Sequence, residues 1–158
     1  MNNNIRPLEG HQNVVPGAQT QEEVRKLDKS VSASEDSLVS VSTVFPFELF
    51  PDKVIVDSTK VTIIKQSFFY VYHTESILIK DLVTVVVETS LFFAAVRFVD
   101  RFFADNPTSV HYLWKEDAER IRTVIHGLMV ASDQNIEIKD VPSSTLVPKL
   151  EQIGSTGN

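Results

Sequence analysis

The residues able to do chemistry are few and scattered in this sequence. Its four histidines are His11, His73, His111 and His126. None of them stands four positions from another histidine or a carboxylate, which is the helical spacing of a common zinc motif. His73 and His111 would have to meet across two strands to bind a metal ion, and both are more simply interpreted as ordinary strand residues. We therefore expect no metal site.

The carboxylates that stand out for acid–base chemistry lie in or beside predicted turns. They are Asp57, Asp81, Asp100 and Asp105. Aspartate is favoured in turns by local hydrogen bonding to the backbone alone, so a structural role is the simpler interpretation. Because these side chains do not converge by any motif, we expect no catalytic residues and no enzyme.

Glycine is nearly absent from the central part of the chain. Between Val41 and Asn135 the only glycine is Gly127, inside a predicted helix, where we expect it to allow close packing of the helix on a sheet. A nucleophile elbow, a dinucleotide-binding turn and a phosphate-binding loop all need glycine to bring the backbone against a ligand. The core therefore lacks these motifs, and we expect no cofactor.

Composition and charge exclude further classes. The formal net charge of −6 argues against nucleic acid or anionic lipid as a partner. The absence of cysteine excludes disulfides and thiolate chemistry and fits a reducing compartment. No signal peptide is expected at the start, and Glu88 and Arg97 interrupt the most apolar segment, Leu82 to Val99, so we expect no transmembrane segment. Together these features predict a cytoplasmic protein.

The chain divides into three predicted segments. Residues 1–36 are polar and rich in Asn, Gln, Ser and Glu, which predicts a flexible, disordered leader. All aromatic residues lie between Phe45 and Trp114, and because aromatic side chains dominate core burial, we place the core there. We assign residues 37–134 to the folded domain and residues 135–158 to a C-terminal extension with a short helix.

Short strands fill the first part of the domain. The segments that indicate them are KVIVDS, KVTIIKQSFFYVYH, SILIKDLVTVVVETS, LFFAAVRFVDRFFA and TSVHYLW, all rich in β-branched or aromatic residues. Turn signals about every 8–12 residues predict a small antiparallel sandwich or barrel of about six or seven strands.

The period of the apolar residues then becomes helical. In KEDAERIRTVIHGLMVAS one face carries Ala118, Ile121, Val124, Ile125, Leu128 and Met129, and acidic residues crowd the first turn, where the helix dipole favours them. A second, shorter helix is predicted in SSTLVPKLEQIG, capped by Ser143 or Ser144, with Leu146, Leu150 and Ile153 on one face. The fold class is therefore α+β and mostly β, a curled sheet capped by a C-terminal amphipathic helix.

This order of elements resembles the pleckstrin-homology-like (PH-like) superfold, and most closely bacterial PH-like domains of uncharacterised function. The segments that carry the resemblance are PDKVIVDSTKVTII, SILIKDLVTVVVETSLFFAAVRF and KEDAERIRTVIHGLM, and it covers roughly Val44 to Ser132. The resemblance implies a scaffold and no particular activity. Phosphoinositide-binding PH domains carry a basic loop between their first two strands, whereas VDSTK offers only Lys60 beside Asp57, so no phosphoinositide binding is expected.

The aromatic doublets are the most informative surface signal. If each doublet lies in a strand, its two members face opposite sides of the sheet, so some rings must face outward. The candidate interaction surface comprises Phe68, Phe69, Tyr70, Tyr72, Phe92, Phe93, Phe102 and Phe103. Alternatively, the lead-in FPFELFP, which we expect to pack on the barrel, or the C-terminal LVPKLEQI covers these rings. An unpaired strand edge could also accept a strand from a partner.

Three functional hypotheses follow, in this order. The first is a non-catalytic PH-like scaffold or adaptor that acts by contact with a protein partner or by self-association. The second is a carrier of a small hydrophobic ligand in the barrel, which a dry and filled core would contradict. The third is an enzyme using turn carboxylates, which a polar pocket with convergent Asp and His would favour.

Overall fold

The computed structural model describes residues 37–68, 71–102, 104–138 and 140–156. All of its described elements belong to one compact unit, Ser34–Asn158. Their order is β1 (Val39–Ser42), β2 (Lys53–Val56), β3 (Lys60–Phe68), β4 (Val71–Leu78), the 3-10 helix η1 (Ile79–Asp81), β5 (Leu82–Thr89), β6 (Phe93–Asp100), β7 (Thr108–Trp114), α2 (Lys115–Asp133) and α3 (Ser143–Ser155). The leader predicted at residues 1–36 lies outside the described residues, and the three predicted segment boundaries stay predictions.

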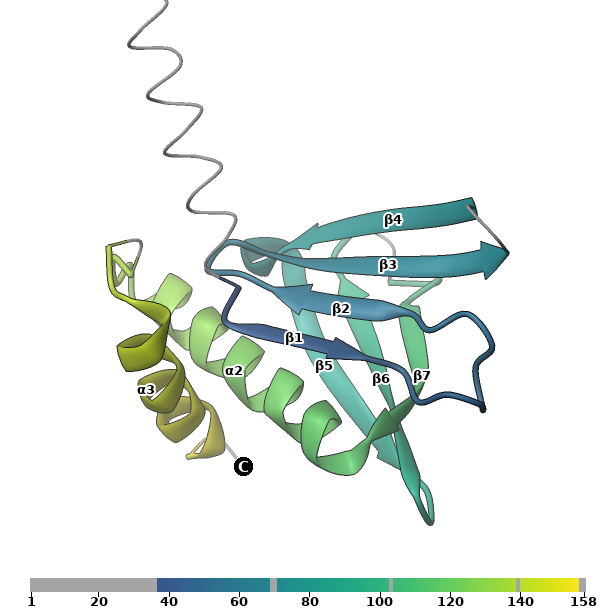
Figure 1. The fold of residues 1–158 in the computed structure, drawn as a ribbon. Helices are drawn as coiled ribbons and strands as arrows, with labels where there is room; N and C mark the ends of the chain where they lie inside the picture. The colour runs from purple at the N-terminus through teal and green to yellow at the C-terminus, as the bar shows by residue number, and fades with distance from the viewer. Residues whose placement is uncertain (1–36, 69–70, 103, 139, 157–158) are drawn as a thin grey trace, which may run out of the picture. The chain divides into compact units, whose positions relative to one another are not determined.

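The strands form two antiparallel sheets (Figure 1). One has the order β1-β2-β3-β4 and the other β5-β6-β7, so the expected class, α+β and mostly strands, is confirmed. The sheets do not close into a barrel, which corrects that part of the expectation. At η1 the chain leaves the first sheet and begins the second, and β4 and β5 are not paired. Figure 1 shows the strands of the two sheets running in different directions.

The core between the sheets is aliphatic. The fully buried strand residues include Val54 and Val56 of β2, Val61 and Ile63 of β3, Val96 and Phe98 of β6, and Val110 and Leu113 of β7. The period of two in these strands puts one face on the core and the other outside. Among the described aromatic residues only Phe98 is buried. The buried strand residues named here lie between Phe45 and Trp114, where we placed the core, but the premise that aromatic side chains dominate it is wrong for the described residues, because β-branched residues and leucine fill it.

Helix α2 closes this core, as its apolar period predicts. Ala118, Ile121, Val124, Ile125 and Leu128 are buried against the strands, and Met129 packs at the margin. Glu116 and Asp117 occupy the first turn, where they interact favourably with the helix dipole. None of the described helices is long and apolar enough to cross a membrane.

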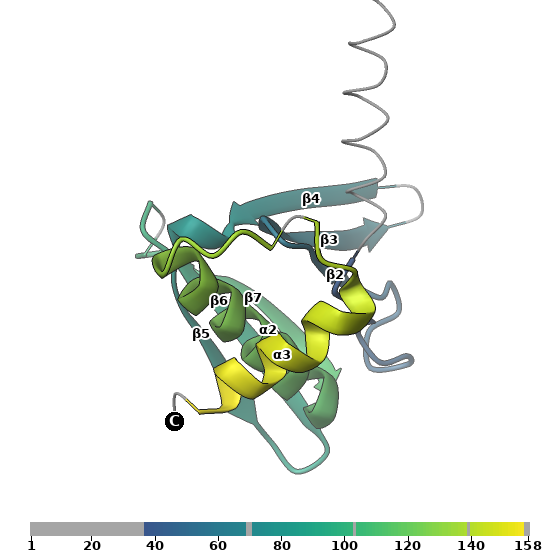
Figure 2. The same cartoon turned by 90° about the vertical axis from the view of Figure 1, so that its left-hand side faces the viewer.

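Helix α3 packs on the outer side of α2, as Figure 2 shows. A Cβ atom on Gly127 would overlap the carbonyl oxygen of Leu150, and one on Gly154 would overlap that of Thr123. Gly127 therefore serves helix–helix packing and not the helix–sheet packing that we expected. The helix begins after Pro142 with no side-chain cap, so neither Ser143 nor Ser144 caps it as predicted.

Leu146 and Leu150 of the predicted apolar face are buried, whereas Ile153 of the same predicted face is 37% exposed. Two glycines, one on each helix, thus let the two backbones approach closely. This contact fixes α3 to the rest of the domain.

We expect Gly127→Ala to destabilise the protein. In an isolated helix this change would be favourable by about 1 kcal/mol. Here the new methyl group has to displace the backbone of α3, and overpacking of this kind costs about 1–3 kcal/mol. Denaturant unfolding measures the difference, with Ser132→Ala on the exposed side of α2 as the control, expected within about 0.5 kcal/mol of the wild type. Equal stability of Gly127→Ala and wild type would mean that α3 does not pack there.

Candidate functional site

A β-bulge in β7 organises the most unusual surface of the domain. Ala94 pairs with Leu113 and Val96 with Val110, so His111 and Tyr112 together oppose the single residue Ala95. Tyr112 has a φ of 57°, which is uncommon for a residue with a side chain. Strict alternation would place Tyr112 on the same face as Val110, toward the core. The extra residue instead leaves His111 and Tyr112 both exposed.

The bulge also holds the connection between β1 and β2. The backbone N–H of Val44 donates to the carbonyl oxygen of Tyr112 at 2.9 Å. A few residues further on, the ring of Phe47 packs on Phe93, with 4.7 Å between centroids, and lies 6.3 Å from that of Tyr112. The lead-in FPFELFP therefore packs on the strands, as predicted, but on the outside of β6 and β7.

The rings gathered at this place form what we call the aromatic surface, which consists of Phe47, Phe92, Phe93, Tyr112 and Trp114. Phe93 lies at its centre, with its centroid 5.4 Å from that of Trp114 and 6.5 Å from that of Phe92. The outer members keep much of their area in solvent: Phe92 is 67% exposed, Phe47 59%, Trp114 52% and Tyr112 44%. These rings therefore stack on one another without being covered.

The predicted surface residues do not all meet here. Phe92 and Phe93 belong to the aromatic surface, whereas Tyr72 lies exposed on β4 in the other sheet. Phe102 follows the opposite end of β6, so the length of that strand, about 23 Å, separates it from Phe93. Phe69, Tyr70 and Phe103 lie outside the described residues, and of Phe68 only the backbone is described.

The doublet argument assumed that both members of a doublet lie in one strand, and two of the three doublets do not meet that condition. Phe92 precedes β6 and Phe102 follows it, so neither doublet lies wholly within a strand. The inward positions of β6 are Ala94, Val96 and Phe98. Sequence reasoning also missed Phe47, Tyr112 and Trp114. Of these three, only Phe47 has a local sequence signal: it lies between two prolines, which indicate a segment outside a regular strand.

Beside the aromatic surface lies a pocket with a volume of about 530 Å³, which we call the acidic pocket. It is lined by Phe47, Glu48, Leu49, Phe50 and Asp52 of the β1–β2 connection, Lys65, Gln66 and Ser67 of β3, and Ser109 and His111 of β7. The Thr43 hydroxyl accepts a hydrogen bond from the Asp52 backbone N–H at 2.9 Å. It forms a second hydrogen bond with the side chain of Glu48. Thr43 thereby links the Asp52 backbone and the Glu48 side chain in the wall of this pocket.

The two carboxylates of the acidic pocket are both unfavourably placed for ionisation. Burial raises the pKa of Glu48, and the charge of Asp52 raises it further. Burial also raises the pKa of Asp52, which is 8% exposed, although the Gln66 backbone N–H donates to its Oδ1 at 3.2 Å. Among the described residues, Glu48 Oε2 is a buried side-chain oxygen with no hydrogen-bond partner.

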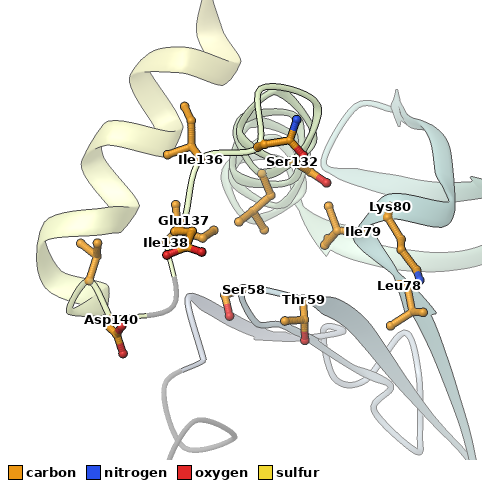
Figure 3. A pocket seen from close by; sticks show the side chains of 13 residues that line it. Ser58, Thr59, Leu78, Ile79, Lys80, Ser132, Ile136, Glu137, Ile138 and Asp140 are labelled. Carbon is orange, nitrogen blue, oxygen red and sulfur yellow. The ribbon is translucent and has the colours of Figure 1, made fainter.

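A second pocket, the α2–α3 pocket, has a volume of about 820 Å³ (Figure 3). Apolar side chains from several elements line it: Leu78, Ile79, Leu128, Ile136, Ile138 and Val141. Figure 3 shows Ser58 and Thr59 of the β2–β3 turn on one side, with Ser132 and Glu137 across from them. Since β2 separates this turn from the β1–β2 connection, the two pockets lie at opposite ends of that strand.

Three of the four turn carboxylates named from the sequence make local structural contacts. Asp57 Oδ1 accepts hydrogen bonds from the backbone N–H groups of Thr59 and Lys60, and Asp100 accepts one from Phe102. Asp81 pairs with Arg101 at 3.7 Å. Within the part of the chain that the structure describes, no group of three or more acidic or histidine side chains could hold a metal ion.

With this geometry in view, we compared the chain with known proteins. No protein-family model, no curated protein and no solved structure matches it.

Because Tyr112 lies in the bulge, we expect glycine and valine at position 112 to differ in stability in the opposite direction from an ordinary strand position. Tyr112→Gly and Tyr112→Val both remove the ring, and at an ordinary strand position valine is favoured over glycine by up to about 1 kcal/mol. At a φ of 57° the β-branched valine is strained, so we expect Tyr112→Val to be less stable than Tyr112→Gly by about 1–3 kcal/mol. Thermal and denaturant unfolding compare the two variants. A more stable valine variant would contradict the bulge.

The acidic pocket predicts a pH-dependent effect of Glu48→Gln. Because the folded state raises the pKa of Glu48, ionised Glu48 destabilises the folded state, and this penalty disappears as the pH falls through the raised pKa. At pH 7 the variant should therefore be the more stable, by at most about 1 kcal/mol since solvent screens a partly exposed group. Below about pH 4 the difference should vanish. Unfolding curves between pH 4 and pH 8 test this, and a pH-independent difference would contradict it.

Proposed function

We propose that this protein is a non-catalytic domain that acts by contact with another protein, through the aromatic surface. The observation that carries the proposal is the exposure of Phe47, Phe92, Tyr112 and Trp114 around the central Phe93, in a domain whose core is aliphatic. Contiguous exposed apolar patches mark interaction sites in soluble proteins. Tryptophan and tyrosine are also the side chains most enriched at the energetic centres of protein interfaces.

The scaffold that we propose is PH-like. In its support, a four-stranded and a three-stranded antiparallel sheet follow one another in the chain, and an amphipathic helix comes directly after the last strand. This is the order of elements on which the resemblance to bacterial PH-like domains rests. A cytoplasmic location and a bacterial origin belong to the same proposal.

The partner in this proposal is a protein, either a different chain or a second copy of this one. A net charge of −6 disfavours nucleic acid. The β2–β3 turn, where Asp57 binds the backbone and only Lys60 adds positive charge, offers little to a phosphoinositide. The edges of both sheets provide a second route, by strand addition, to the same kind of contact.

The carrier hypothesis has support at a different place from the one expected. Among the described residues, fully buried side chains, most of them aliphatic, pack between the sheets, which argues against a ligand there. The α2–α3 pocket, at about 820 Å³ and with six aliphatic side chains in its lining, has the size of a small-molecule site. A hydrophobic-ligand carrier is therefore the second candidate function, located in this pocket.

An enzyme is the third candidate. Asp52 and His111 do converge on one polar pocket, the arrangement that we expected to favour this hypothesis. Among the described residues, however, no hydrogen bond joins His111 to Glu48 or Asp52, so the pocket does not contain the bonded base and orienting group of an activated nucleophile.

Light scattering coupled to size exclusion tests the contact in its self-associating form. If the full chain forms an oligomer, the double variant Phe47→Ser/Trp114→Ser should dissociate it. Phe102→Ser is the matched control, because Phe102 is 70% exposed and lies outside the aromatic surface, and it should leave the oligomer intact. Circular dichroism verifies that each variant is folded.

If the full chain is monomeric, site-specific photo-crosslinking in cells that produce it tests for a different partner. A benzophenone amino acid at position 92 should give discrete adducts that the same group at position 102 does not. A monomer that yields no adduct specific to position 92 would contradict the proposed function.

A further inference from the structure

Strand β4 forms an edge of the first sheet that is open to solvent. In the sheet order β1-β2-β3-β4 it pairs with β3 on one side and, among the described residues, with no strand on the other. The residues from Val71 to Thr74 are all exposed, so both faces of this half of the strand are uncovered. Open edges pair readily with other strands, and most proteins protect them with lysine, proline, a bulge or a covering segment. β4 contains neither lysine nor proline, and its register with β3 is regular from Tyr72 to Leu78.

Two hydrogen bonds beside β3 show in which direction its backbone groups point. The N–H of Ile79 donates to the carbonyl oxygen of Thr59 at 2.9 Å, so these two opposed residues bond across the β3–β4 ladder. The next residue, Lys60, bonds on the other side, where its carbonyl oxygen accepts from the N–H of Asp57 at 3.0 Å. The residues of β3 therefore alternate between partners in β4 and partners in β2.

This alternation divides the backbone groups of β4 in the same way. Bonded and non-bonded pairs alternate along an antiparallel ladder, and every second residue counted back from Ile79 bonds to β3. These bonded residues are Ile77, Glu75 and His73. The residues between them turn their N–H and carbonyl groups toward the open edge, and they are Tyr72, Thr74 and Ser76.

Few registers let a second copy of β4 pair antiparallel with this edge, because outward-facing residues of one copy must meet outward-facing residues of the other. Two such registers share the greatest overlap, one centred on Thr74 and one on Glu75. The register centred on Glu75 places the two Glu75 carboxylates directly opposite each other, which is destabilising. The register centred on Thr74 places His73 opposite Glu75 of the second copy, twice by symmetry. Charge and hydrogen bonding therefore favour the register centred on Thr74.

We propose that this protein dimerises by antiparallel pairing of β4 with β4 of a second copy, in the register centred on Thr74. The contact is isologous, so each favourable pair occurs twice. It joins the four-stranded sheets of the two copies into one continuous sheet. The proposal goes beyond the proposed function, because β4 belongs to the other sheet and the pairing does not use the aromatic surface.

The side chains of β4 complement one another in this register. The Thr108 hydroxyl donates to Oε1 of Glu75 at 2.7 Å, which holds the carboxylate on the face where His73 of the second copy lies. Thr74 lies opposite Thr74, a favoured cross-strand pair. Val71, which is exposed in the single chain, lies opposite Ile77 and so gains an apolar neighbour.

A single introduced cysteine reports this register, since the chain has no cysteine of its own. Thr74→Cys places the two cysteine Cα atoms about 5.5 Å apart, a separation that a disulfide spans, so we expect a covalent dimer under mild oxidation. Tyr72→Cys is the matched control, because the two copies of residue 72 lie about 14 Å apart in this register and should not crosslink. A mixture of Tyr72→Cys and Ser76→Cys chains should form the mixed disulfide.

Thr74→Pro tests the backbone contact itself. Proline removes the outward N–H and leaves the bonds to β3 in place, and an edge strand tolerates it there. The two copies lose two hydrogen bonds, so we expect the dimer dissociation constant to rise at least about tenfold in light scattering over a dilution series. Thr74→Val keeps the N–H and should remain dimeric, and circular dichroism verifies that both variants are folded.

Three results would overturn the proposal: a full chain that is monomeric throughout the dilution series, a dimer that Thr74→Pro leaves unchanged, or a disulfide formed by Glu75→Cys in place of Thr74→Cys. The outcome is separable from that of the proposed function. If copies of this chain use both contacts, Phe47→Ser/Trp114→Ser dissociates a larger oligomer into dimers held by β4. A dimer lost only in Thr74→Pro, without a crosslink specific to position 92, would retain the β4 pairing and reject the aromatic contact. A monomer with that crosslink would do the reverse.

Discussion

The bulge at His111 and Tyr112 is the constraint on which both candidate sites depend. By opposing two residues to Ala95, it turns Tyr112 outward onto the aromatic surface while His111 faces the acidic pocket. The carbonyl oxygen of Tyr112 then accepts the hydrogen bond that fixes Val44 at the start of the β1–β2 connection. A regular β7 strand would leave Tyr112 toward the core and the connection without this anchor. A bulge held in a left-handed conformation by a residue other than glycine or asparagine costs energy, and such costs are found where function requires the geometry.

The bulge matters because the domain fills its core with aliphatic side chains and leaves aromatic side chains at the surface. Aliphatic residues from both sheets and from α2 fill the core, and α3 adds a second helical layer through the close contact at Gly127. Among the described aromatic residues, Phe98 alone is buried in this core. Leaving Phe92, Phe47 and Trp114 largely in solvent sacrifices several kcal/mol of hydrophobic stabilisation, at about 25 cal/mol per Å². Under the proposed function, contact with a partner recovers part of that free energy.

Sequence reasoning succeeded where the signal is local and periodic. The apolar spacing from Ala118 to Leu128 predicted α2 and its buried face, and β-branched segments between turn signals predicted the strands. Whether those strands close into a barrel depends on pairing between distant segments, which no local pattern reports. Likewise, Gly127 was correctly linked to close packing but to the wrong neighbour, because the position of α3 on α2 is a long-range feature.

The candidate site was harder to predict for related reasons. A tyrosine with positive φ carries no glycine or asparagine signal, so the bulge and the outward turn of Tyr112 are invisible in the sequence. Glu48 and Asp52 stand four residues apart in an irregular connection, and only the fold brings Lys65 and His111 to them. The doublet Phe92-Phe93 contributes the centre of the aromatic surface, but its two members do not lie together in one strand as the argument assumed.

The most direct test of the central claim uses the chain's single tryptophan, Trp114, as a reporter of the aromatic surface. Its fluorescence can be recorded in the dilute, monomeric full chain, together with quenching by acrylamide. We predict the red-shifted emission and ready quenching of a solvent-exposed indole, followed by a blue shift and protection when the surface is occupied by a partner or a second copy. Blue-shifted, protected emission in the dilute monomer would mean that the chain itself covers these rings, and it would contradict an open contact surface.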